Sequence, residues 1–179
     1  MSGELVYVFA DPKVKQALPV PPPLRALFES FEAGEPMVEV RVGSWRELEA
    51  AARPIRNDVF IGEQKIPAEM EWDDADPAAV HAVAFNRMGR ALATGRMLEH
   101  VPGTAKIGRM AVSATARHCG VGRAVLDALL DAARSRGDRQ AMLHAQLGAA
   151  PFYERAGFVR RGPAFDEAGI AHVEMLRAL

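Results

Sequence analysis

Cysteine is almost absent from this chain: its 179 residues include one, Cys119. A single cysteine excludes an intramolecular disulfide and favours a reducing, cytoplasmic location. The five histidines are scattered and provide no metal-ligand spacing with it, so we expect no metal site.

Net charge and long apolar runs are also lacking. The 22 Lys and Arg residues and 23 Asp and Glu residues leave a formal net charge of -1, so no overall basic field attracts nucleic acid. No apolar stretch approaches the roughly 20 residues of a membrane-spanning helix, and the N-terminus has no secretion-signal pattern. We therefore expect neither nucleic acid nor a membrane as a partner. The sequence leaves open whether two copies form a homodimer.

The composition, 49% hydrophobic and 25% charged residues, is typical of a globular domain with a sizeable core. Residues 1–35 are predicted to form a Pro-rich N-terminal appendage, with a short strand at Glu4–Phe9. Four prolines between Pro19 and Pro23 favour extended polyproline geometry there. The compact domain is predicted to span residues 36–179.

Hydrophobic periodicity predicts the order of elements in this domain. Helical spacing predicts a helix after Ser44 that Pro54 interrupts and Gly62 ends, then a long helix over 122–137 and a short one over 149–156. Residues 63–80 are acidic and aperiodic, which is typical of a functional loop. Alternating or buried apolar runs predict strands at 37–42, 81–85, 91–98, 106–112, 140–146, 158–161 and 172–176. This order indicates a mixed α/β fold.

Residues 109–124 place two glycines between a strand and the long helix, and read RMAVSATARHCGVGRA. Backbone N–H groups of such a turn and of the helix N-terminus converge on one point, which makes an anion site that Arg117 and Arg123 reinforce. Neither the Walker pattern nor G-x-G-x-x-G is present. An ordinary tight strand-to-helix connection is the alternative interpretation.

The same loop carries a family resemblance. Residues 117–122 (RHCGVG) match the pattern (Gln/Arg)-x-x-Gly-x-(Gly/Ala), and residues 146–158 (QLGAAPFYERAGF) look like Asn-x-x-Ala-x-x-x-Tyr-x-x-x-Gly-Phe. In this order the two signatures resemble the GNAT superfamily of acyl-CoA-dependent acyltransferases. Residues 59–64 (VFIGEQ), 145–146 (AQ) and 165–172 (FDEAGIAH) are similar to its ElaA-type branch. The resemblance covers about residues 37–176, and His118 departs from it because many members have glycine there.

The resemblance implies a three-layer α/β fold, in which helices flank a twisted, mostly antiparallel sheet. A V-shaped opening between the strands at 106–112 and 140–146 would split this sheet and hold the pantetheine arm of acetyl-CoA. Tyr153 would be the general acid that protonates the departing thiolate, and its alternative is a packed core tyrosine. The implied cofactor-binding residues are Met110, Ala111, Val112, Arg117, His118, Cys119, Gly120, Val121, Gly122, Arg123, Gln146 and Tyr153.

The acceptor side is less sharply predicted. Glu63 is the candidate base for an acceptor amine, and its alternative is a solvated carboxylate at a helix end. The remaining candidates for acceptor contacts have ordinary alternatives as loop acids, satisfied strand histidines or ion-paired arginines; they are Glu71, Asp73, His81, Arg96, Arg109 and His172. Cys119 lies inside the predicted phosphate loop, and we do not expect it to act as a nucleophile.

The predicted function is N-acetyl transfer from acetyl-CoA, by direct attack, to an amine of a small molecule or a protein. Two alternatives remain open. An acyltransferase could use a longer acyl-CoA, or a non-catalytic module could bind CoA for regulation.

Overall fold

The computed structural model describes residues 8–179 and divides after Met37 into two compact units. The first unit holds a small hairpin of β1 (Ala10–Asp11) and β2 (Gln16–Ala17), followed by α1 (Pro22–Glu32). Of the predicted strand at Glu4–Phe9, residues 4–7 lie outside the described residues, and Val8 and Phe9 are not in a strand. The prediction of extended geometry through Pro23 is wrong, because the last two prolines of the run begin α1, where a missing N–H breaks no helical hydrogen bond.

The second unit contains a mostly antiparallel sheet, as predicted. Its strand order is β3-β4-β5-β6-β7-β9-β8, and β6 and β7 form the parallel pair while the other neighbours are antiparallel. The strands are β3 (Val38–Ser44), β4 (Val80–Asn86), β5 (Ala91–Val101), β6 (Thr104–Val112), β7 (Gln140–Gln146), β8 (Val159–Glu167) and β9 (Ile170–Ala178).

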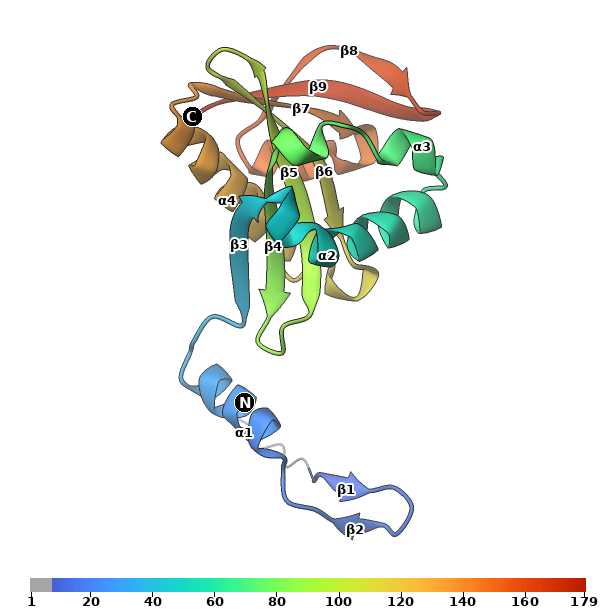
Figure 1. Cartoon of the computed structure of the whole chain (residues 1–179), viewed down its shortest axis with the longest axis vertical. Helices are drawn as coiled ribbons and strands as arrows, with labels where there is room; N and C mark the ends of the chain where they lie inside the picture. The colour runs from blue at the N-terminus through green and yellow to red at the C-terminus, as the bar shows by residue number, and fades with distance from the viewer. Residues whose placement is uncertain (1–7) are drawn as a thin grey trace, which may run out of the picture. The chain divides into compact units, whose positions relative to one another are not determined.

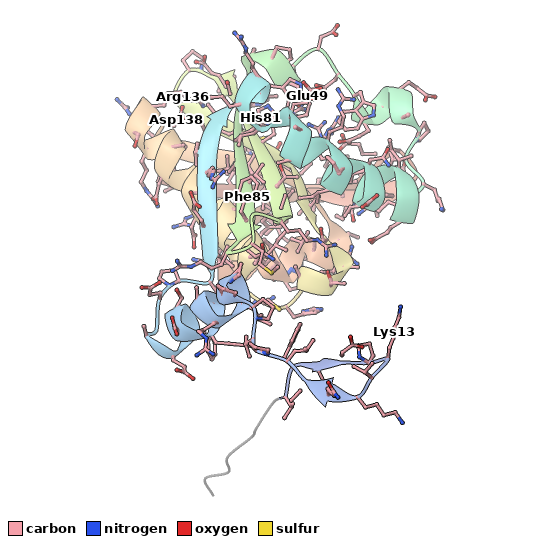
Figure 2. The ribbon with its side chains drawn as sticks, turned by 60° about the horizontal axis from the view of Figure 1, so that its bottom comes forward. Lys13, Glu49, His81, Phe85, Arg136 and Asp138 are labelled. Carbon is pink, nitrogen blue, oxygen red and sulfur yellow. The ribbon has the colours of Figure 1, made fainter. Side chains whose placement is uncertain are left out.

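Helices cover both faces of this sheet (Figure 1). On β4, Ala82 and Ala84 pack in the cluster that contains α4 (Val121–Arg136), whereas Val83 and Phe85 pack against α2 (Trp45–Arg56). Alternate residues of a strand point to opposite faces, so the two helices lie on opposite sides of β4. Figure 2 labels Phe85 together with His81, which belongs to the α2 face. The three-layer arrangement is therefore confirmed.

Helix α2 begins at a capping box, in which the Ser44 N–H donates to Glu47 Oε2 at 2.8 Å. The predicted interruption at Pro54 is wrong, since α2 continues through it to Arg56. The chain then widens into a π-helical segment, η1 (Asn57–Glu63), and the N–H of Asn57 contacts the carbonyls of both Arg53 and Pro54. Widened turns of this kind absorb irregularities in the helical hydrogen-bond ladder.

The acidic segment 63–80 is more ordered than predicted. It holds α3 (Ala68–Glu71) and one 3₁₀ turn, η2 (Asp76–Ala78). The final two strands are longer than predicted and meet at a turn around Ala168–Gly169. Within residues 8–179, no helix has both the length and the apolar character needed to cross a membrane.

Candidate active site

A cleft opens where β6 and β7 separate. The two strands pair from Thr104 with Gln140 to Lys106 with Met142, and both then line a cavity of about 1180 Å³. Further walls come from η1, the start of α4, α5 (Ala150–Arg155) and the β8–β9 turn. The predicted opening is thus present between the predicted strands.

A β-bulge interrupts β6 at this cleft. Thr94 pairs with Ala111 but Arg96 pairs with Gly108, so β6 has one extra residue, and Arg109 takes a positive φ of 51°. Such a bulge leaves a backbone group without its ladder partner. Met110 lies on the α4 side and Ala111 packs with η1, so the strand contributes side chains to both faces while its backbone borders the cleft.

Gly95 stands opposite the bulge and has no space for a side chain. A Cβ there would lie 2.5 Å from Met110 Sδ and 2.8 Å from Leu129 Cδ1. Glycine at this position therefore allows the bulged strand and α4 to pack closely.

The glycine loop opens α4 at the edge of the cleft. Gly120 has a left-handed φ of 80° at the helix N-cap, and no side chain caps the helix. The first N–H groups of a helix have no acceptor within it, so they remain available to an anion. His118 also has a positive φ, 64°, a backbone conformation that glycine adopts more readily than other residues.

The predicted cofactor residues divide into two groups. Two of them do not line the cleft: Cys119 is exposed, and Val121 is buried in the core. The others line the cleft: Met110, Ala111, Val112, Arg117, His118, Gly120, Gly122, Arg123, Gln146 and Tyr153.

Arg117 links the loop to η1. Its Nη2 pairs with Glu63 Oε2 at 2.5 Å and its Nε donates to the Val112 carbonyl at 3.2 Å. The Glu63 carboxylate, predicted as the base, is thus already paired with a guanidinium. Arg123 pairs with Asp127 at 2.8 Å one turn along α4.

Tyr153 is a buried residue that borders the cleft. Its ring packs edge-on against Phe152 and Phe158, with centroids 4.9 and 6.0 Å apart, and burial raises its pKa to about 12. The hydroxyl has no hydrogen-bond partner among residues 8–179. Every fully buried side-chain oxygen in that range has such a partner, so the Tyr153 hydroxyl is not fully buried. The hydroxyl is therefore accessible, and it is protonated at neutral pH.

A buried ionic network anchors the acidic segment beneath the cleft. Arg56 of α2 pairs with Glu71 and with Asp76, the latter at 2.8 Å, and Asp76 also binds Arg96 of β5 at 2.8 Å. Burial raises the pKa of Glu71. Burial also favours a higher pKa for Asp76, but the hydrogen bonds from the two arginines outweigh it and lower the value. Sequence reasoning missed Arg56 and Asp76, because neither belongs to a motif.

The predicted acceptor residues Asp73 and Arg109 belong to the same network. Asp73 receives bonds from Arg96 and Arg109, and the hydrogen bond from Arg96 is the main reason that its pKa falls to about 2. Arg109 also pairs with Glu71 at 3.1 Å. The network therefore contains three arginines and three carboxylates, and the cleft wall that they form carries little net charge.

His81 lies outside the cleft. It is 1% exposed, its Nε2 contacts the Asp76 carbonyl at 2.9 Å, and burial is the main cause of its lowered pKa. Its position gives it no access to an acceptor in the cleft.

The opposite wall comes from β7 and the β8–β9 turn. His172, one of the residues predicted to contact the acceptor, lines the cleft, and its ring stacks on Phe165 with centroids 6.1 Å apart. His144 also lines the cleft; it lies 3.4 Å from Glu167 Oε2 and edge-on to Phe165 at 4.9 Å. Sequence reasoning missed His144, although its spacing of two from Gln146 on a strand signalled a shared face.

Gln146 joins these walls, since its Nε2 donates to Gln64 Oε1 at 2.9 Å across the cleft. No group of three or more His, Cys, Asp or Glu side chains in the described part of the chain is arranged to hold a metal ion.

Comparisons with known proteins agree with this architecture. Residues 60–179 match the family described as acetyltransferase (GNAT) domain. The uncharacterized N-acetyltransferase YjcF of Bacillus subtilis is 34% identical over 124 residues, covering 69% of this chain and 87% of YjcF. An acyl-CoA N-acyltransferase from Pseudomonas aeruginosa is 32% identical with a TM-score of 0.70, covering 79% of this chain and 99% of that one. Escherichia coli ElaA is 26% identical with the same TM-score and coverage.

Proposed function

Since the chain belongs to the acetyltransferase (GNAT) family, we propose that it transfers an acetyl group directly from acetyl-CoA to an amine of a small molecule or a protein. The observation that supports this most is the meeting of three features at one cleft. These are the separated strands β6 and β7, the bulge in β6 and the uncapped start of α4. Residues 36–179 would be the acetyltransferase domain.

The loop before α4 would bind the pyrophosphate of acetyl-CoA. Its first helical N–H groups provide partial positive charge, and Arg117 and Arg123 line the same part of the cleft. The pantetheine arm would pair with the free edge of β6 along Met110–Val112, as an added strand does.

The bulge and Tyr153 would perform the transfer. A backbone N–H that the bulge leaves without a ladder partner would be suited to stabilise the oxyanion that forms when the amine attacks the thioester carbon. As the C–S bond breaks, the thiolate needs a proton. Tyr153 is protonated and accessible, so it can donate one.

Enzymatic release of free CoA tests the proposal and separates it from its alternatives. Acetyl-CoA, propionyl-CoA and octanoyl-CoA are each incubated with a panel containing spermidine, tyramine, L-lysine and a tripeptide with a free N-terminus. Amine-dependent thiol release with acetyl-CoA is expected. A preference for octanoyl-CoA would favour a longer acyl donor, and binding of acetyl-CoA without release with any amine would favour a non-catalytic module.

A further inference from the structure

We propose that His144 is the base that removes a proton from the acceptor amine, and that Glu167 is its positioning residue. This inference rests on the proposed transfer reaction. It assigns the removal of the amine proton, because Tyr153 would protonate the thiolate and the Glu63 carboxylate is already paired with Arg117. Neither His144 nor Glu167 was among the candidates that the sequence motifs suggested for catalysis.

The position of His144 follows from strand register. Lys106 pairs with Met142 in the parallel ladder, so two residues further along, Gly108 of β6 and His144 of β7 lie at the same level. Gly108 borders the bulge where the thioester carbonyl is expected. Figure 1 shows β7 next to β6, with β9 and β8 beyond it.

The face of the sheet also suits an acceptor. Leu143 and Ala145 pack into the core with α4, so alternation places His144 on the opposite face. Gln146 shares that face and binds Gln64 at the end of η1. An amine bound between η1 and β7 would therefore lie on the same face of the sheet as His144.

Glu167 orients the imidazole. Its Oε2 lies 3.4 Å from Nδ1 of His144, and the edge-on contact with Phe165 further restricts the imidazole ring. Nε2 has no hydrogen-bond partner among residues 8–179. Every fully buried side-chain nitrogen in that range has such a partner, so Nε2 is accessible. A carboxylate at Nδ1 favours the tautomer whose Nε2 accepts a proton.

Two other candidates fit less well. Glu63 is ion-paired with Arg117, and a free carboxylate is a weaker base than an imidazole near neutral pH. His172 is held by a contact between its Nδ1 and the Ile170 carbonyl at 2.8 Å. It fits the base role less well because it is on β9, one strand farther from the opening.

Charged groups surround His144 on each side. On β9, Glu174 is its direct register partner and lies 3.6 Å from Arg161 of β8; His172 is the diagonal neighbour. Across the opening, Lys106 and Arg109 line the cleft. Glu167 is thus the carboxylate in direct contact with the imidazole.

The protons balance as follows. The ammonium form of the acceptor gives one proton to His144 Nε2, which passes it to solvent. The nitrogen lone pair then forms the C–N bond, and the C–S bond breaks with its electron pair on sulfur. Tyr153 protonates that sulfur, and the second proton of the nitrogen restores Tyr153 through solvent, which leaves the amide and free CoA.

The test compares pH profiles of kcat/KM for the best amine of the panel, with thiol release as the assay. For His144→Gln we expect a fall of about 10²-fold or more at pH 7 and loss of the acid limb, with recovery toward pH 10 as the amine deprotonates by itself. Glu167→Gln should lower kcat for the amine while the Kd of acetyl-CoA stays at the wild-type value, because the imidazole loses the carboxylate that orients it. A merely structural role of Glu167 would not separate these two quantities.

Exposed His100 of β5 lies outside the cleft, so His100→Gln is the matched control and should keep the wild-type profile. Circular dichroism and acetyl-CoA binding verify folding, and His144→Asn replaces any His144→Gln protein that fails to fold. If the wild type acylates an amine and either folded His144 variant keeps the acid limb, or if His172→Gln removes it instead, this inference is overturned and the proposed function stands. If the wild type acylates no amine, both are overturned.

Discussion

Substitution of Gly122 tests the phosphate loop, because this residue lies in the first turn of α4 and borders the cleft. A Cβ at this position would lie 3.0 Å from Val112 Cγ2 and 3.9 Å from Phe152 Cζ. Gly122→Val therefore adds a branched side chain between these walls, beside the helix N–H groups that would bind pyrophosphate.

The magnitude follows from the hydrogen bonds at risk. Losing one charge-assisted bond to phosphate costs about 1–3 kcal/mol, which raises the Kd of acetyl-CoA by about 5- to 150-fold. Overpacking against Val112 costs a further 1–3 kcal/mol or so of folding stability, so binding must be measured well below the unfolding temperature.

Isothermal titration calorimetry with acetyl-CoA measures this effect. Gly62→Ala is the control, because its Cβ would make an ordinary 3.5 Å contact with the Asn57 carbonyl and Gly62 does not line the cleft. Arg117→Ala should weaken binding less than Gly122→Val. A folded Gly122→Val protein with the wild-type Kd would refute the phosphate-loop assignment.

Four further predictions address the site and its support. Tyr153→Phe should lower kcat by roughly 10²–10⁴ with little change in acetyl-CoA affinity; an unchanged kcat with chemistry limiting would exclude the general-acid role. Glu63→Gln should alter kcat/KM for the amine by at most about fivefold, which is the scale of an exposed ion pair. If this variant instead lost the acid limb of the pH profile, Glu63 and not His144 would be the base. Arg56→Ala removes one of the two arginines that pair with each of the buried carboxylates Glu71 and Asp76, so it should cost about 3–5 kcal/mol in urea unfolding, whereas a loss below about 1 kcal/mol would contradict the network. The pKa of Asp73 falls to about 2 in the folded protein, so its ionised form contributes stability above about pH 4 that disappears toward pH 2. The difference in unfolding free energy between wild type and Asp73→Asn should therefore close over that range, and a difference that is independent of pH would contradict this.

Local sequence patterns predicted the elements whose periodicity is strong. Helix α4 and strand β7 begin and end within one residue of the predicted bounds, and the β4–β5–β6 meander follows from alternation and turns. Pro54 misled the prediction, because the rule that proline ends a helix ignores the π-helical segment that follows. The position of the sheet opening came from the family resemblance, because no local pattern reports where two parallel strands separate.

The two walls of the acceptor side depend on contacts that local reading does not reveal. Arg56 and Asp76 are 20 residues apart and meet only after α2 and η2 pack on the same side of the sheet. His144 and Glu167 meet only because β8 extends six residues beyond its predicted end at Arg161, to Glu167. Long-range packing brings each of these two pairs of residues together. A sequence motif can therefore include Glu167 without indicating that His144 is its partner.

Backbone and side chains therefore have separate roles in this cleft. Beyond Lys106 the facing edges of β6 and β7 are unpaired within the described residues, while α4 and η1 keep the flanking faces packed. In the proposed reaction, backbone groups would bind the thioester arm with little dependence on side-chain identity, so many sequences could retain donor binding. The choice of acceptor would then reside in the side chains of the two walls, which are the arginine–carboxylate network on one side and the turn that carries Glu167 on the other. Substitutions in that turn should change which amine is acylated before they change which acyl-CoA is bound.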